Sequence, residues 1–289
     1  MPDPAITFGP LRSSEPTPQP RGPHAGGAAT ARTAGVRGDA IARETPRAPS
    51  LRDVAQTGGN ASAASDPARR SALVSALVAH VPAADRPAAK TAVPAILDAA
   101  RRSGTTDPNR LGYLLATAQT ESDFGANMTE SGHSKAWFNA TYGGEDGNRP
   151  GTSDGYDYRG RGYVQTTRAG RYAELSHSLG LPDVVSRDRG KATPEAALVA
   201  HPERLDQPEL AARALVVGVT KNLFTHNPAA ALDRTIPTGH KPGDADFYHA
   251  RGIVNGIVKD QAAAIAEHAT VYAQILAGYR QSVLGEKPR

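Results

Sequence analysis

Apolar residues recur three or four positions apart along much of this chain, with polar residues on the opposite face. This spacing is typical of amphipathic helices that pack on a core. The stretches with this pattern are residues 71–81, 87–104, 107–125, 167–180, 208–224 and 259–284. The sequence carries no internal repeat. The pattern therefore predicts a mainly α fold with a bundle-like body.

Two of these stretches carry signals for helix ends. In the second, Pro94 is expected to bend the helix and Gly104 to end it. In the third, Asp107 is the predicted N-cap, Pro108 takes the first helical position, and Gly125 lies just past the expected end. The third helix is therefore well bounded.

The helical pattern is interrupted between Gly125 and Thr167, where Gly, Asn, Asp and Ser predominate. Long segments without such a pattern are usually either functional or disordered. Trp137, Phe138 and several tyrosines favour an ordered segment, because disordered regions are poor in aromatic residues. We expect a loop-rich lobe here, with one short β-hairpin in the glycine-rich stretch at residues 156–167.

Residues 1–66 differ in composition from the rest of the chain. They are rich in Pro, Gly, Ala, Ser, Thr and Arg, and Phe8 is their only aromatic residue. Such a segment buries too little apolar surface to offset the entropy lost on ordering. We therefore expect a disordered N-terminal arm over residues 1–66 and one folded domain over residues 67–289.

Composition excludes several chemistries. The 289 residues include no cysteine, which rules out disulfides, thiol catalysis and Cys/His metal clusters, and neither a cofactor nor a metal is expected. No apolar run approaches the roughly 20 residues of a membrane span, and the N-terminus lacks the pattern of a secretory signal. The net charge of +4 would suit an anionic polymer such as a cell wall or a nucleic acid, although a modest excess is usually only a solubility feature.

Glu121 is the first candidate for catalysis. Leu111, Leu114, Leu115 and Ala118 form the apolar stripe of the third helix, and Glu121 continues the same face. Burial disfavours an ionised carboxylate and raises its pKa toward the range in which it donates a proton near neutral pH. The alternative is that the helix ends at Glu121 and the carboxylate reaches solvent.

A second carboxylate would complete a glycosidase site. Glycosidic hydrolysis commonly uses two, about 5 Å apart for retention of configuration or about 6.5–9.5 Å apart for inversion. The loop after Glu121 supplies the candidates, most of which would be solvated or form Asx turns. They are Asp123, Glu130, Glu145, Asp146, Asp154 and Asp157. Spacing along the chain does not choose among them.

An ordered series of motifs lies within about residues 107–280. The motifs are LLATAQTESDFGANMTES, ATYGGEDGNRPGTSDGYDYRGRGYVQTTRAGRY, HPERLDQPELAARALVVGV and ARGIVNGIVKDQAAAIAEHATVY. Together they resemble the catalytic half of family 19 glycoside hydrolases, the plant-type chitinases and the related bacterial and phage endolysins of the lysozyme-like superfamily. In those proteins a helix ends in the general acid, and a glycine-rich segment lines the substrate cleft. The resemblance therefore implies a lysozyme-like multi-helix fold.

The resemblance also implies roles for particular residues. Glu121 falls at the general-acid position, and Gln165 at the glutamine that hydrogen-bonds sugar amides or hydroxyls. Asn255 falls at a substrate-contacting asparagine. Tyr142 and Tyr163 fall where aromatic residues line or support the cleft, which suits the flat apolar faces of sugars.

Arg159 and Arg161 match the arginines of the family's Arg-Gly-Arg-Gly segment. We interpret them chiefly as structural pairs that hold the cleft strand and its carboxylates. Taken alone, this segment would be typical of a basic flexible loop or an RNA-binding tract.

The chain departs from the family pattern in two places. Thr120 stands where many relatives carry histidine, so an adjacent imidazole cannot tune the acid. Arg168 and Arg171 stand where glycine and asparagine are common. Glu130 and Glu145 both remain candidates for the second catalytic carboxylate.

The sequence thus predicts an inverting hydrolase of β-1,4-linked N-acetylated amino sugars. Glu121 would protonate the leaving oxygen, and Glu130 or Glu145 would activate a water. Peptidoglycan is the favoured substrate because of the positive net charge, with chitin as the alternative. A lytic transglycosylase, which needs one acidic residue, and an inactive protein that binds glycans or a host protein are the rival functions. Nucleic acid is not an expected partner.

The polar arm of residues 1–66 suggests delivery without a classical signal peptide. An unfolded polar leader threads easily through a narrow conduit, such as that of a phage particle or a specialised bacterial secretion machine. The protein would then be cytoplasmic before delivery. The alternative is a linker of no consequence for transport.

Overall fold

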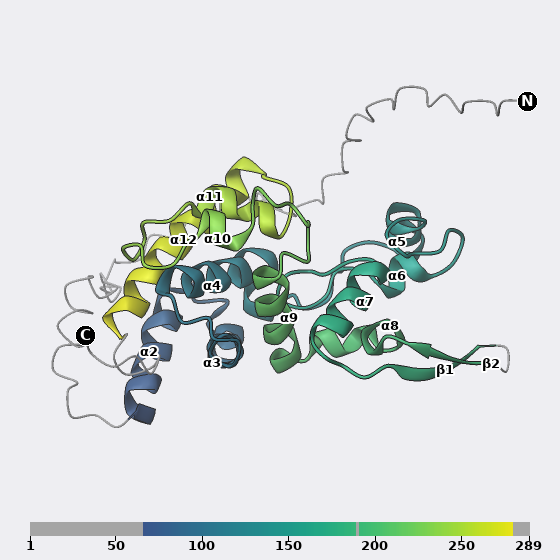
Figure 1. Ribbon diagram of the computed structural model, residues 1–289, viewed down its shortest axis with the longest axis horizontal. Helices are drawn as coiled ribbons and strands as arrows, with labels where there is room; N and C mark the ends of the chain where they lie inside the picture. The colour runs from purple at the N-terminus through teal and green to yellow at the C-terminus, as the bar shows by residue number, and fades with distance from the viewer. Residues whose placement is uncertain (1–65, 189–190, 280–289) are drawn as a thin grey trace, which may run out of the picture. The chain divides into compact units, whose positions relative to one another are not determined.

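The computed structural model describes residues 66–188 and 191–279 (Figure 1). Over these ranges the protein is mainly helical and has one two-stranded antiparallel sheet, which confirms the predicted fold class. The predicted N-terminal arm lies outside the described residues except for Asp66, where the first described helix begins. The part of the predicted last helix beyond residue 279 lies outside them as well.

The longer helices define the architecture. They are α2 (Asp66–His80), α3 (Arg86–Arg102), α4 (Pro108–Ser122), α5 (Lys135–Tyr142), α7 (Ala169–Ser178), α9 (Pro208–Thr220) and α12 (Lys259–Gly278). Short turns connect them: η1 (Asp123–Gly125), α6 (Asp154–Asp157), α8 (Ala197–Ala200), η2 (Pro202–Asp206), α10 (Leu232–Thr235), α11 (Phe247–Ala250) and η3 (Arg251–Ile253). The strands are β1 (Val184–Asp188) and β2 (Lys191–Glu195), and their register pairs Val184 with Glu195.

The start of α4 follows from its local sequence. The Asp107 carboxylate accepts hydrogen bonds from the backbone N–H groups of Asn109 at 2.9 Å and Arg110 at 3.3 Å. These two groups would otherwise lack partners in the first turn of the helix. Pro108 occupies the first helical position, where its missing N–H removes no bond. Both predicted start signals are confirmed.

The end of α4 differs from the prediction. The helix stops at Ser122, and Asp123 forms its C-cap in the left-handed conformation, with a φ of 50°. An aspartate tolerates this conformation better than most residues because its short side chain can form local hydrogen bonds. Gly125 therefore ends the following 3₁₀ turn rather than α4.

The main core forms where α4 packs along α12, with α3 packed on both α2 and α9 (Figure 1). The predicted stripe of α4 is buried in this core. Its members are Leu111, Leu114, Leu115 and Ala118. A Cβ atom added at Gly112 would lie 2.6 Å from the carbonyl oxygen of Ala269, so the backbones of α4 and α12 touch at this point. Glycine is required here by the close approach.

A second apolar cluster joins α7, α8 and η2 to one face of α9. Its buried members are Tyr172, Leu175, Leu179, Leu198, Leu205, Leu210, Ala214 and Leu223. Because α9 also packs in the main core, it connects the two clusters. None of the helices in the described part of the chain is long and apolar enough to cross a membrane.

The predicted loop-rich lobe also contains helices. The segment from Gly125 to Thr167 includes α5 and α6 between its loops. Helix α5 begins after Ser134, whose Oγ accepts a hydrogen bond of 3.2 Å from the backbone N–H of Trp137. The aromatic residues that indicated order therefore lie on a helix.

The predicted position of the β-hairpin is wrong. It spans residues 184–195, after α7, and not the glycine-rich stretch at residues 156–167. In that stretch Arg161 makes isolated β-bridges to both Thr129 and Thr166. One bridge joins the stretch to Thr129 and the other, to Thr166, lies within it, so the stretch forms isolated bridges instead of a regular two-stranded ladder.

Two histidines lie where the C-terminal ends of α2 and α4 meet the middle of α12. The ring centroids of His80 and His268 are 6.3 Å apart, and that of Tyr272 is 5.6 Å from His80. Tyr272 donates a hydrogen bond of 2.5 Å to Gln119 of α4. Burial lowers the pKa of His268 below its ordinary value, and burial together with the charge of His268 lowers that of His80. The nearby Glu267 carboxylate opposes both shifts without reversing them.

We expect these histidines to make the fold less stable as the pH falls below about 6.5, the ordinary pKa of histidine. Their folded-state pKa values are lowered, so the unfolded chain binds protons more readily in this range, and its population rises on acidification. Urea unfolding at pH 7.5, 6.5 and 5.5 should show a steeper loss for the wild type than for His268→Gln, which cannot be protonated. Identical pH dependence in the two proteins would contradict this assignment.

Candidate active site

Glu121 lies in the last turn of α4 and is largely enclosed. Its side chain is 14% exposed, and its Oε1 lies 2.9 Å from Nη2 of Arg251, whose side chain is 1% exposed. The same Nη2 donates a hydrogen bond of 3.0 Å to Gln261 in the first turn of α12. The predicted burial of the carboxylate is therefore accompanied by a buried cation that sequence reasoning did not assign to the site.

A buried tyrosine lies beside the ion pair of Glu121 and Arg251. Tyr113 of α4 is fully buried and donates a hydrogen bond of 2.7 Å to the carbonyl oxygen of Ala250, next to Arg251. Burial raises the pKa of Tyr113 above its ordinary value, so its hydroxyl remains a donor. Charges removed from water in this way interact strongly, and their geometry must be held by the surrounding structure.

A short ladder of hydrogen bonds, most of them between backbone groups, begins at the residue after Glu121. The Oγ of Ser122, the next residue, lies 3.3 Å from the carbonyl oxygen of Tyr163 and donates to it. Farther along, Gly162 N–H donates to Met128 at 2.9 Å, and Glu130 N–H donates to Gly160 at 2.8 Å. The segments 122–130 and 160–163 therefore run beside each other, with Glu121 preceding one end of the ladder and Glu130 at the other.

Glu130 is the half-buried carboxylate at the far end of this ladder. Its Oε1 accepts a hydrogen bond of 2.9 Å from the Tyr142 hydroxyl, and its Oε2 accepts one of 3.0 Å from Gly160 N–H. Burial and the negative charge of Glu130 raise the pKa of Tyr142 above its ordinary value. Tyr142 therefore stays protonated, and the two donors fix the orientation of the Glu130 carboxylate.

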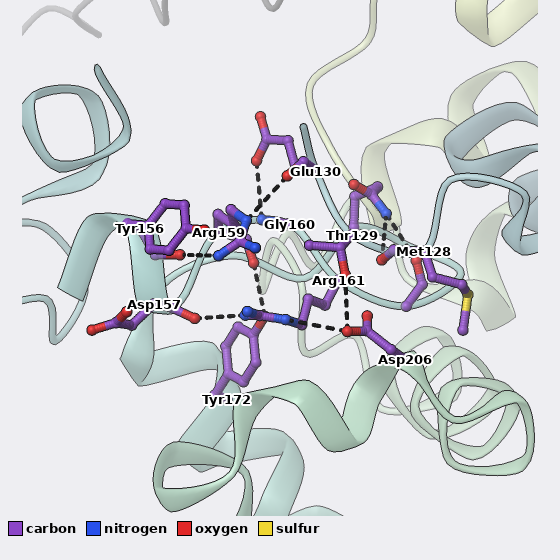
Figure 2. A network of polar contacts seen from close by, with 12 residues as sticks. Met128, Thr129, Glu130, Tyr156, Asp157, Arg159, Gly160, Arg161, Tyr172 and Asp206 are labelled. Carbon is purple, nitrogen blue, oxygen red and sulfur yellow. Dashed lines mark hydrogen bonds and ion pairs between the residues drawn. The ribbon is translucent and has the colours of Figure 1, made fainter. Parts of the chain in front are cut away.

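Arg161 anchors the other side of the glycine-rich segment (Figure 2). Its guanidinium donates to the carbonyl oxygen of Asp157 at 2.5 Å, and its Nε lies 3.5 Å from the Asp206 carboxylate. Thr129 donates a hydrogen bond of 2.8 Å to the same carboxylate. Burial raises the pKa of Asp206 above its ordinary value, although Thr129 and Arg161 act against this. Arg161 is 7% exposed, so its contacts are internal.

Arg159 braces the same segment from within (Figure 2). It donates to the carbonyl oxygens of Glu130 at 3.1 Å and Tyr156 at 2.7 Å. Its guanidinium carbon lies 4.0 Å from the centroid of the Tyr156 ring, which adds a cation–π contact. The carbonyl oxygen of Arg159 accepts a bond of 2.8 Å from Tyr172 of α7. These contacts of both arginines are made with groups of the protein itself.

Tyr163 is buried, whereas Gln165 is half-buried. Gln165 Nε2 donates to the carbonyl oxygens of Asn127, Met128 and Gly162 at distances of 3.0–3.2 Å, and its φ of 51° is left-handed. Tyr163 is 2% exposed and belongs to the main core. The expected direct contact of the Tyr163 ring with a sugar is therefore not available here, because the core covers the ring. Gln165 holds the backbone beside Glu130 through its Nε2, and its side chain remains partly exposed.

The remaining candidates lie at the edge of the site. Glu145 is 62% exposed, and its Oε2 makes an ion pair of 2.7 Å with Arg168. Asn255 is exposed, and its Oδ1 accepts a hydrogen bond of 2.8 Å from Gly256 N–H. Asn255 N–H donates to the carbonyl oxygen of Arg251, so it lies one turn beyond the cation that holds Glu121.

The structure thus brings Glu121 and Arg251 together at one end of the ladder, and Glu130, Tyr142 and Gln165 at the other. An enclosed carboxylate beside a cation can exchange a proton with a bound group, while a fixed carboxylate can orient a water. Within residues 66–188 and 191–279, no three His, Asp or Glu side chains gather as they would around a metal ion. Arg251 could have been suspected from the sequence, because a lone charge stands there among Ala250, Gly252 and Ile253.

In comparisons with known proteins, no protein-family model and no curated protein sequence matches this chain.

Proposed function

We propose that this chain is a glycoside hydrolase that cleaves β-1,4 bonds between N-acetylated amino sugars, with peptidoglycan as its substrate. The observation that carries the proposal is the pair of carboxylates near opposite ends of the hydrogen-bonded segments 122–130 and 160–163. Glu121 is enclosed and paired with Arg251, and Glu130 is held by Tyr142 and Gly160. Two carboxylates with different surroundings are what acid and base roles in glycoside hydrolysis require.

Glu121 is the general acid in this proposal. Its enclosure limits hydration of the ionised carboxylate and so favours the protonated form, whereas the ion pair with Arg251 favours the ionised form that remains once the proton has passed to a bound glycosidic oxygen. After the transfer, the guanidinium of Arg251 stabilises the negative charge that Glu121 carries. Arg251 thus acts as a positioning residue for the acid.

Glu130 is the general base in this proposal, in preference to Glu145. The Glu130 carboxylate is fixed by two neutral donors and keeps its remaining lone pairs for a water. The Glu145 carboxylate is instead directed to the guanidinium of Arg168. A base must lie within hydrogen-bond reach of the water it activates, and a fixed orientation makes this reach reproducible.

Peptidoglycan is favoured over chitin by charge. The chain carries a net charge of +4, and the bacterial wall is an anionic polymer. A lytic transglycosylase is the rival within the same class, because it needs the enclosed Glu121 alone.

The test is to incubate the purified full-length chain with peptidoglycan sacculi and, separately, with chitin oligosaccharides. We expect falling turbidity of the sacculi and, by mass spectrometry, products that have gained one water at a reducing end. Products with anhydro-muramic ends would instead show that the reaction is lytic transglycosylation and not hydrolysis. If neither polymer is cleaved, the enzymatic proposal is contradicted, and a glycan-binding or host-binding protein is favoured.

A further inference from the structure

Arg168 has a backbone conformation that normally belongs to glycine. It is the N-cap of α7, with φ 71° and ψ 140°. A side chain at a positive φ with an extended ψ meets steric hindrance from its own backbone, which glycine avoids. Such strain persists only where neighbouring structure imposes it, and it concentrates at functional sites.

The neighbouring structure does impose it. Arg168 N–H donates to the carbonyl oxygen of Tyr158 at 2.8 Å, and Ala169 N–H donates to the Asn148 side chain at 2.9 Å. Gly170 N–H donates to the carbonyl oxygen of Asp146 at 2.7 Å. Three consecutive N–H groups are thus fixed by other segments. Glycine would satisfy this backbone without strain, so a role for the arginine at this position has to come from its side chain.

The side chain places a cation beside the candidate base. The guanidinium carbon lies 5.6 Å from the centroid of the Tyr142 ring, and the hydroxyl of the same ring holds Glu130. The side chain of Arg168 is 22% exposed, and its Nε is buried without a hydrogen-bond partner among the residues that the structure describes. One aromatic ring therefore separates the cation from the carboxylate that would activate water.

The present partner of Arg168 does not explain the strain. Glu145 is 62% exposed, and exposed ion pairs contribute little to stability. The neighbouring Arg171 differs, because its guanidinium is divided among Asp146, Glu174 and the carbonyl oxygen of Leu223. The Glu145 carboxylate shows the position at which Arg168 accepts an anion, and a carboxylate on a ligand can take that position.

We propose that Arg168 determines specificity by binding a carboxylate carried on the glycan next to the sugar at Glu130, and that Glu145 occupies this position when the site is empty. The inference rests on the proposed function and narrows its substrate class. The class is an anionic glycan with carboxylate substituents, as peptidoglycan has on its lactyl-peptide stems, and not an uncharged polymer such as chitin. Arginine suits this role because its planar guanidinium binds carboxylates with two parallel hydrogen bonds.

The test measures binding by calorimetry in the Glu121→Gln background of the full chain, so that turnover is avoided. The probes are a peptidoglycan tetrasaccharide with free stem carboxylates, the same compound with these carboxylates amidated, and a chitin oligosaccharide of equal length. Arg168→Gly should weaken binding of the free acid about tenfold relative to the amidated compound, because a charge-assisted hydrogen bond is lost. Glu145→Gln should tighten binding of the free acid, because it removes the internal competitor.

Two controls keep the result specific. Arg168→Gly suits the observed backbone, so its melting temperature should not fall by more than about 2 °C, which shows that the variant is folded. Lys221→Gln removes one positive charge at the exposed C-cap of α9 and should leave the ratio of the two affinities unchanged.

The outcomes separate the two proposals. Equal weakening of the acid and the amidated compound by Arg168→Gly, or no binding of any probe, overturns the role of Arg168. If the wild type cleaves peptidoglycan while the ratio of affinities is unaffected, this inference alone fails. If the Glu121→Gln protein binds the free acid selectively through Arg168 but the wild type cleaves no glycan, the inference stands and the proposed hydrolysis fails.

Discussion

Glu121→Gln is expected to lower the rate of peptidoglycan clearing by about 10²–10⁴-fold, the contribution typical of a general acid. Glutamine keeps the size of the side chain and an oxygen that can accept the hydrogen bond from Arg251. It cannot donate the proton that the leaving oxygen needs. The rate should be measured as release of new reducing ends from sacculi, because turbidity also responds to binding.

The matched control is Glu203→Gln. Glu203 lies in η2 with its side chain 65% exposed, and its neighbour is His201 at 3.5 Å. This control removes one carboxylate charge from the surface and should retain the wild-type rate. Equal activity of Glu121→Gln and the wild type, with both proteins folded by circular dichroism, would end the assignment of Glu121 as the acid.

Arg251→Met is expected to lower the free energy of unfolding by about 3–5 kcal/mol, the cost of breaking a buried ion pair from one side. Methionine fills part of the space of the arginine stem but leaves the enclosed Glu121 without its cation. The hydrogen bond to Gln261 is lost as well. Urea unfolding followed by circular dichroism measures the change.

Two variants identify the cause of this loss. Arg70→Met breaks the pair between Arg70 and Asp98, whose side chains are 30% and 34% exposed, and should cost no more than about 1 kcal/mol. The double variant Glu121→Gln/Arg251→Met should be more stable than Arg251→Met alone, because the carboxylate is then no longer left unpaired. A cost of Arg251→Met equal to that of Arg70→Met would show that the buried pair does not stabilise the fold.

The sequence predicted those features that depend on neighbouring residues. The start of α4 followed from Asp107 and Pro108, whose effects act within one helical turn. The apolar stripe of α4 could be located because helix periodicity fixes which residues share a face. Helix α5 was missed because its aromatic residues lie in a segment rich in Gly and Asn, although Ser134 carries the signal of an N-cap.

The arrangement of the site depends on contacts between residues far apart in the sequence, which local sequence patterns do not predict. Arg251 and Glu121 lie far apart in the sequence. They come together because α12, which follows Arg251, packs against α4. The burial of Tyr163 is likewise a property of the main core and not of the motif around it. Sequence spacing could therefore nominate Glu130 and Glu145 together, and only their different hydrogen-bond partners separate them.

The touching backbones of α4 and α12 have a consequence for synthesis on the ribosome. Glu121 acquires its cation from residue 251 and its supporting helix from residues 259–278, all of which are synthesised after it. Because elements made late in translation cannot stabilise earlier ones before they emerge, the nascent chain lacks the paired acid until α12 has left the exit tunnel. A wall-degrading activity built in this order would be absent from every translation product that ends before α12 is complete.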